Sequence, residues 1–160
     1  MRGIYTLAIR LERNARCRIA ALGTNCFKKG MYLYTGSARG QGSTSLERRI
    51  ERHGGRQKSR FWHIDYLLGI NGCRIVACVY SETSRDLECA ANRTIQKSTG
   101  RDHPMRGFGS SDCNCRSHLM YIQSGNARRT LHLLMAAYRK LGLKPKLWDT
   151  ARLASLGPIA

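Results

Sequence analysis

The chain has 160 residues, 42% of them apolar, so it is long enough to bury the core of one domain and too apolar to be wholly disordered. Lysine and arginine total 28 against 10 acidic residues, which gives a formal net charge of +18 and a pI near 10.4. No apolar run approaches the ~20 residues that a bilayer span requires, and the first residues lack the apolar core of a secretory signal. We therefore expect a cytoplasmic protein that does not cross a membrane.

The positive charge indicates a polyanionic partner. Most of the basic residues are arginine, whose planar guanidinium suits phosphate oxygens. A field of this size attracts polyanions whatever the fold, so we expect nucleic acid. An anionic membrane surface is the weaker alternative, because no predicted helix is both strongly basic and broadly apolar.

The first third of the chain reads as successive strands. Residues Gly3–Leu11 and Cys17–Gly23 alternate in polarity, with a turn near Asn14 and Ala15 between them. Residues 24–30 are predicted to be a connection, and Met31–Gly36 a third strand. Three strands with short links favour an antiparallel sheet.

A basic helix should follow the glycine-rich segment after Gly36. Thr44 precedes Glu47 by three residues, the spacing of a capping box, and Gly54 and Gly55 should end the helix. Three residues at helical spacing form the predicted buried stripe: Leu46, Ile50 and His53.

The second half of the chain alternates helices with strands. We predict a short helix in Phe61–Gly69, a central strand at Cys73–Tyr80 and a helix that begins after an N-cap at Ser84. The core-facing stripe of that helix is Leu87, Ala90, Ala91, Thr94 and Ile95. A last strand at Leu119–Gln123, an amphipathic helix closed by Gly142 and a shorter piece around Asp149–Leu156 complete the prediction.

The predicted fold class is therefore α/β, with a small, mostly antiparallel central sheet flanked by helices and a helical C-terminal extension. Residues 1–125 form the predicted main domain. Residues 126–160 form the basic helical extension.

Two short motifs then point to a family. Gly3-Ile4-Tyr5 on the first strand and Tyr34-Thr35-Gly36 on the third resemble the paired motifs of the GIY-YIG nuclease superfamily. The order strand–strand–helix–strand–helix extends the likeness over about residues 3–122. The segments YLYTGSA, RRIERH, FWHIDYLL, ECAA and GFGSSDCNCRSHL resemble a small archaeal-type branch, found alone or beside endonuclease III-type DNA glycosylases.

The resemblance implies a role for five residues. Arg49 matches the family's helix arginine, His53 the histidine four residues on, and Glu88 the glutamate that anchors the metal. With Tyr5 and Tyr34 they would form a phosphodiesterase site. Arg49 would stabilise charge on the phosphate, and the tyrosines would position or deprotonate water with His53 as the proton relay.

The implied function is that of a metal-dependent endonuclease that hydrolyses DNA phosphodiester bonds in DNA repair or processing, with DNA favoured over RNA as the nucleic-acid partner. The implied cofactor is Mg²⁺ or Mn²⁺ on Glu88, and a DNA-repair protein is the implied protein partner. The alternative is a non-catalytic nucleic-acid-binding module on the same scaffold. The basic residues expected to contact nucleic acid are Arg39, Arg48, Arg52, Arg56, Lys58 and Arg60.

Two features depart from the family pattern. The strand at Cys17–Gly23 is inserted between the two motifs, where the family has a single tight hairpin. An asparagine that often follows the last family helix has no counterpart, and Ser110, Ser111 or Asp112 stands in that region.

The seven cysteines are scattered, and we expect reduced thiols. Cys113, Cys115 and His118 have part of the spacing of a zinc site, but a structural site needs four ligands and no fourth is evident nearby. Two interpretations therefore stand: thiols packed in a tight loop, or a zinc-stabilised interaction domain.

Overall fold

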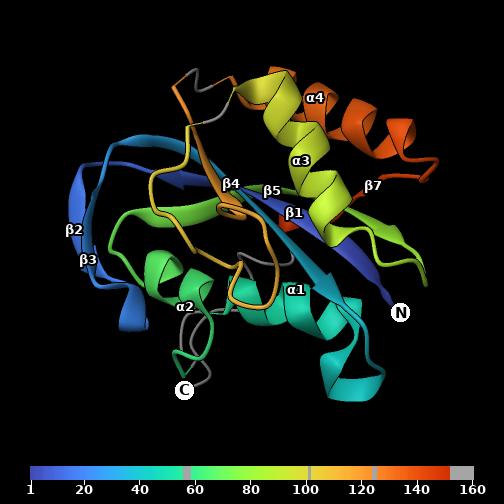
Figure 1. The fold of residues 1–160 in the computed structure, drawn as a ribbon, viewed down its shortest axis with the longest axis horizontal. Helices are drawn as coiled ribbons and strands as arrows, with labels where there is room; N and C mark the ends of the chain where they lie inside the picture. The colour runs from blue at the N-terminus through green and yellow to red at the C-terminus, as the bar shows by residue number, and fades with distance from the viewer. Residues whose placement is uncertain (56–58, 101, 124–125, 152–160) are drawn as a thin grey trace.

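The computed structural model describes residues 1–55, 59–100, 102–123 and 126–151, and it confirms the predicted α/β class (Figure 1). Five strands pair antiparallel in one sheet, in the order β6 (Leu119–Ile122), β4 (Gly30–Ala38), β1 (Gly3–Leu11), β5 (Cys73–Glu82) and β7 (Lys146–Leu147). The described α-helices are α1 (Leu46–Gly54), α2 (His63–Leu68), α3 (Glu88–Thr99) and α4 (Ala127–Lys140). A separate hairpin joins β2 (Ala15–Arg18) to β3 (Thr24–Phe27), and short 3-10 turns lie at Ala20–Leu22 and Gly42–Thr44.

The sheet lies between two helical layers. Figure 1 shows α1 and α2 below the sheet and α3 and α4 above it. β1 is the middle strand, and both of its faces are covered. Alternate residues of a strand point to opposite faces, so Tyr5 and Leu7 pack on the α1–α2 side while Ile4 and Ala8 pack on the α3–α4 side.

The helix α4 belongs to the same core as the sheet. Leu134, Ala137 and Tyr138 are buried among sheet residues, and the Tyr138 hydroxyl lies 3.0 Å from Oγ1 of Thr6 on β1. Thr6 Oγ1 also lies 3.1 Å from Thr35 Oγ1, so a buried hydroxyl network joins α4 to the two central strands. Among the described residues, no helix has the length and apolar character needed to cross a membrane.

Several predicted elements are confirmed. The strands at Gly3–Leu11 and Cys73–Tyr80 are β1 and β5, and the short helix in Phe61–Gly69 is α2. The stripe of α1 is buried as predicted, and Gly55 caps its end. The last strand and the long amphipathic helix are β6 and α4.

The predicted strand at Cys17–Gly23 is wrong. β2 ends at Arg18 and the chain turns through residues 20–22, because Ala20 and Gly23 both adopt positive φ angles, 43° and 91°. The chain then returns as β3, in the segment predicted to be a connection, and Arg18 pairs with Thr24. The polarity of residues 17–23 alternates as in a strand, but this alternation does not show that the chain reverses direction there.

Two helix starts also differ from the prediction. Ser45, not Thr44, caps α1, and its side chain accepts a hydrogen bond from the Arg48 amide. α3 begins at Glu88 rather than just after Ser84, because β5 runs on to Glu82 and Thr83 still bonds to Arg2. The two-residue strand β7 was not predicted, and most of the piece at Asp149–Leu156 lies outside the described residues.

Candidate active site

A cavity of about 810 Å³ opens beside the ends of β1 and β4. Four of the five residues expected in a phosphodiesterase site line it: Tyr5, Tyr34, Arg49 and Glu88. They come from β1, β4, α1 and the first turn of α3. The remaining lining residues are Gly36, Ser37, Arg39, Gly40, Thr44, Phe61, Trp62, His63, Gly109, Ser111 and Asp112.

His53 lies behind Tyr5 rather than on the cavity wall. Its Nε2 is 2.7 Å from the Tyr5 hydroxyl, and the side chain is buried on the sheet-facing side of α1. Gly36 pairs with Tyr5 across the sheet, and a Cβ at Gly36 would lie 2.5 Å from the Tyr5 oxygen. The absence of a side chain at Gly36 therefore allows the Tyr5 ring to lie across β4.

Tyr34 is enclosed by aromatic rings and by a glycine turn. The rings of His53 and Phe108 lie edge-on to it, at centroid distances of 6.4 and 6.0 Å. Gly109 has a φ of +68°, and a Cβ there would lie 2.8 Å from Tyr34 Cε2. Glycine at this position both permits the turn and leaves room for the phenol.

Both phenols are protonated at neutral pH. Burial raises the pKa of Tyr5 well above its ordinary value, the neighbouring Tyr34 adds to this, and the Arg49 charge opposes it. Burial and then the Glu88 charge raise the pKa of Tyr34, again against Arg49. A phenol of this kind can accept a proton from water only as it gives up its own, and the only close acceptor that we find for Tyr5 among the described side chains is His53.

Arg49 is held at the cavity wall from two sides. Its Nη1 donates to the Ser37 carbonyl, and its guanidinium carbon lies 4.7 Å from the centre of the Trp62 ring. Its Nε is buried and has no hydrogen-bond partner. Because Arg49 also lines the cavity, an anion that enters it can accept hydrogen bonds from the other N–H groups of the guanidinium.

Glu88 reaches from the first turn of α3 to β4 and to the loop before β6. Its Oε2 accepts from the Ser37 hydroxyl, and its Oε1 lies 2.9 Å from His118 Nδ1. Its side chain keeps 18% of its surface exposed. Each oxygen retains one lone pair, so the carboxylate is able to anchor Mg²⁺, which takes its other ligands from water and phosphate. Asp112 lines the same cavity as a second, exposed carboxylate.

The adjoining wall is formed by α2, which is tied to α1 through Asp65. This buried carboxylate accepts from Arg52 at 2.8 and 3.1 Å and from the backbone amides of Phe61 and Trp62 at 2.9 Å. His63 Nδ1 accepts from the Gly109 amide at 2.9 Å, so neutral His63 carries its proton on Nε2.

The basic residues expected to contact nucleic acid do not all lie together. Arg39 lines the cavity and pairs with Asp86. Arg48 is exposed on α1 and pairs with Glu51.

Two further arginines of that set lie against α2. Arg52 binds Asp65, and Arg60 lies over the Tyr66 ring at 5.5 Å. Arg56 and Lys58 fall outside the described residues.

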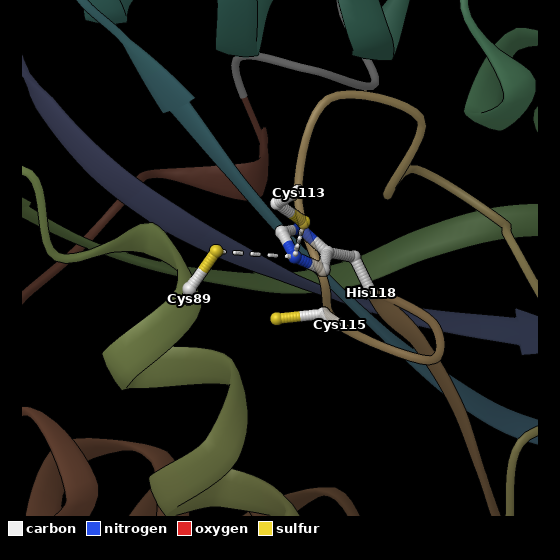
Figure 2. A group of neighbouring side chains, drawn as sticks. All are labelled: Cys89, Cys113, Cys115 and His118. Atoms are coloured by element: carbon white, nitrogen blue, oxygen red, sulfur yellow. Dashed lines mark hydrogen bonds between the residues drawn. The ribbon is translucent and has the colours of Figure 1, made fainter.

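A second cluster lies on the far side of His118. Figure 2 shows Cys89 of α3 pointing toward Cys113, Cys115 and His118 of the loop before β6, and the four ligand atoms lie within 4.8 Å of one another. Sequence spacing identified the last three but not Cys89, which lies far upstream in the chain. In the sequence, the only indication that Cys89 belongs to this cluster was its position next to Glu88 on a predicted helix. Ser37 was missed as well, because the strand was predicted to end before it.

This geometry defines an α/β protein with a polar cavity at the ends of its two central strands. The chain belongs to the family described as "Domain of unknown function DUF123", whose profile matches residues 4–142. The match therefore covers β1 through α4. Neither the curated proteins nor the solved structures contain a significant match to the chain.

Proposed function

We propose that this protein is a metal-dependent endonuclease that hydrolyses DNA phosphodiester bonds, on the GIY-YIG-like arrangement that its motifs resemble. The observation that carries the proposal is the convergence of Tyr5, Tyr34, Arg49 and Glu88 on one cavity. Two phenols, a guanidinium and a carboxylate from four separate elements provide a proton path, an anion stabiliser and a metal anchor. These are the parts that phosphodiester hydrolysis requires.

Arg49 provides the charge stabilisation. As water attacks, negative charge grows on the non-bridging oxygens of the phosphate. The Ser37 carbonyl and the Trp62 ring hold the guanidinium in place, so it does not reorganise during the reaction. Arg49 lines the cavity, so the remaining N–H groups of its guanidinium can donate to a phosphate oxygen there.

Tyr5 and His53 provide the proton path. The attacking water forms a new bond to phosphorus as the bond from phosphorus to the leaving sugar oxygen breaks, and that oxygen takes a proton from solvent. The water passes its own proton to the Tyr5 oxygen, while Tyr5 passes its proton to His53 Nε2, 2.7 Å away. The relay avoids a free phenolate, which the burial of Tyr5 disfavours. Tyr34, on the neighbouring strand, positions the water.

Glu88 would hold Mg²⁺ or Mn²⁺, which supplies Lewis-acid stabilisation of the phosphate and of the leaving oxygen. The Ser37 hydroxyl and His118 fix the carboxylate from two sides. At the rim, Phe61 is 77% exposed and Arg39 is basic. They would stack on a base and contact a phosphate as DNA enters the cavity.

The test is cleavage of labelled DNA. Wild-type protein with Mg²⁺ or Mn²⁺ should cut branched, flapped or damaged duplexes. Arg49→Ala should lower the rate about 100- to 1,000-fold, the usual effect of removing one transition-state donor, and Glu88→Gln should abolish metal-dependent cleavage. Both variants should still shift DNA in a gel.

Matched controls remove the same charges elsewhere. Arg128→Ala on the exposed face of α4 and Glu12→Gln at the end of β1 should cut as well as wild type. Cleavage that survives both Arg49→Ala and Glu88→Gln would refute the proposed roles. Binding without cleavage under any divalent metal would instead identify a non-catalytic nucleic-acid-binding module.

We also propose that this protein is cytoplasmic and that it acts in DNA repair or processing together with a DNA-repair enzyme. The resemblance to proteins found with endonuclease III-type glycosylases supports this context. A tagged chain recovered from its own cells should bring down a DNA glycosylase. Recovery of no repair enzyme would count against the partnership while leaving the cleavage proposal intact.

A further inference from the structure

The strongest feature outside the cavity is the cluster of three thiols and one imidazole. Cys89 Sγ lies 3.9 Å from His118 Nε2, and Cys113 Sγ lies 3.4 Å from it. With Cys115 Sγ, all four atoms are within 4.8 Å of one another. Ligands around tetrahedral Zn²⁺ are separated by roughly 3.5–3.8 Å at normal bond lengths, so small side-chain shifts would complete such a site.

The tautomer of His118 suits a metal at the centre of the cluster. Both neighbours of its Nδ1 are acceptors, the Glu88 carboxylate at 2.9 Å and the Thr35 carbonyl at 3.2 Å. Neutral His118 therefore carries its proton on Nδ1 and presents the lone pair of Nε2 to the three sulfurs. A ring nitrogen that donates to a carboxylate while the other faces the metal is the usual arrangement of a zinc-binding histidine.

The loop is built to bring these ligands to α3. The Gly107 amide donates to the Arg116 carbonyl and the His118 amide to the Phe108 carbonyl, which closes the loop at its base. Asn92 of α3 donates to the Ser117 carbonyl at 2.8 Å. These bonds hold the loop beside the helix turn that carries Cys89.

We propose that Cys89, Cys113, Cys115 and His118 bind one Zn²⁺ as a closed, tetrahedral structural site. Three thiolates and an imidazole form a soft ligand set that suits Zn²⁺ and not the hard Mg²⁺. Binding forms three Zn–S bonds and one Zn–N bond and releases three thiol protons to solvent. The resulting unit carries one negative charge, and Arg93 Nη1, 4.0 Å from Cys115 Sγ, lies beside it to balance that charge.

The zinc would also fix the carboxylate of the cavity. Glu88 precedes Cys89 on α3, and His118 contacts both Glu88 and the cluster. Bound zinc would therefore fix the His118 imidazole, and the imidazole in turn orients the Glu88 carboxylate. The zinc site would thus stabilise the position of the residue proposed to bind Mg²⁺ in the cavity. This second part rests on the proposed nuclease function; the zinc site itself does not.

The test is metal analysis of the full chain, purified without chelator from zinc-supplemented cells. Mass spectrometry of the metals should find about one zinc per chain and no iron. After exchange of zinc for Co²⁺, the absorption spectrum should show thiolate-to-cobalt bands and the strong bands of tetrahedral cobalt. Cys89→Ser and Cys113→Ser should each lower zinc occupancy at least 10-fold.

Cys26→Ser on β3 is the matched control, since Cys26 is exposed and outside the cluster; it should keep full zinc occupancy. Glu88→Gln should keep zinc but bind it about 10- to 100-fold more weakly in chelator competition, as the loss of a carboxylate partner of a zinc-bound histidine usually does. If the cysteine variants do not fold, the cobalt spectrum of the wild type still shows whether thiolates bind the metal.

A wild type without zinc and without thiolate–cobalt bands would overturn the proposal, as would iron in place of zinc. Unchanged zinc occupancy in Cys89→Ser would also overturn it. DNA cleavage is measured on the same preparations, so the two proposals fail separately. Zinc without cleavage supports this site and counts against the nuclease, whereas cleavage without zinc does the reverse.

Discussion

Gly36 shows how one missing side chain shapes the candidate site. It pairs with Tyr5 between β1 and β4, and the Tyr5 ring lies across its backbone. Because Tyr5 is buried and bonded to His53, the ring has little room to move. Residue 36 therefore controls the position of the proposed proton relay.

We predict that Gly36→Ala destabilises the protein by about 1–3 kcal/mol, the usual cost of adding a methyl group to a packed core. The new Cβ would lie 2.5 Å from the Tyr5 oxygen and force the ring away from His53. Urea unfolding measures the change. Gly55→Ala is the control, because its nearest contact is 3.4 Å and its φ is −68°; equal stabilities of the two variants would contradict the prediction.

At the scale of elements, an ion pair joins α1 to α2. Arg52 of α1 reaches Asp65, whose side chain is fully buried and also caps the first turn of α2. Burial works to raise the pKa of Asp65, but the bonds from Arg52, Trp62 and Phe61 outweigh it and hold the pKa below its ordinary value. The carboxylate therefore stabilises the fold in its charged form.

A lowered folded-state pKa has a defined pH signature. The stabilisation is complete above the unfolded-state pKa of about 3.9 and is lost as the pH falls through the lower folded-state value. We predict that Asp65→Asn lowers the free energy of unfolding by about 1–3 kcal/mol at pH 7. Its difference from wild type should shrink below about pH 4.

Urea unfolding at a series of pH values measures this difference. Asp86→Asn, at an exposed aspartate that pairs with Arg39, should change stability by less than about 0.5 kcal/mol. A difference between wild type and Asp65→Asn that stays constant from pH 7 down to pH 2 would argue that the charge of Asp65 does not stabilise the fold.

At the scale of the whole molecule, the net charge of +18 is the property that should control binding to DNA. Binding of DNA by such a chain releases counterions, so affinity should fall steeply with salt. We predict a loss of about 1,000-fold between 50 and 200 mM salt, as expected for roughly six phosphate contacts.

Fluorescence anisotropy with labelled duplexes at several salt concentrations measures that slope. The control is an uncharged peptide nucleic acid of the same base sequence, which should bind weakly and without salt dependence. Affinity for DNA that does not change with salt would rule out phosphate recognition as the basis of binding.

The sequence alone was sufficient for the fold class, for β1, β5, α2 and α4, and for the buried stripe of α1. It failed at the hairpin of β2 and β3, where the pattern of alternation continued through a reversal of the chain. Polarity patterns report which face of a local segment is buried. They do not report where the backbone turns or which strand it pairs with.

Some residues of the candidate site were identified from the sequence, and others only from the structure. The motifs named Tyr5, Tyr34, Arg49 and Glu88, and the structure brings these four to one cavity. Only the tertiary structure placed Cys89 beside Cys113, Cys115 and His118, and turned Arg52 inward to Asp65. The reason is physical: segments distant in the chain meet through the order of the strands and the packing of helices on the sheet, and spacing along the sequence carries no record of that meeting.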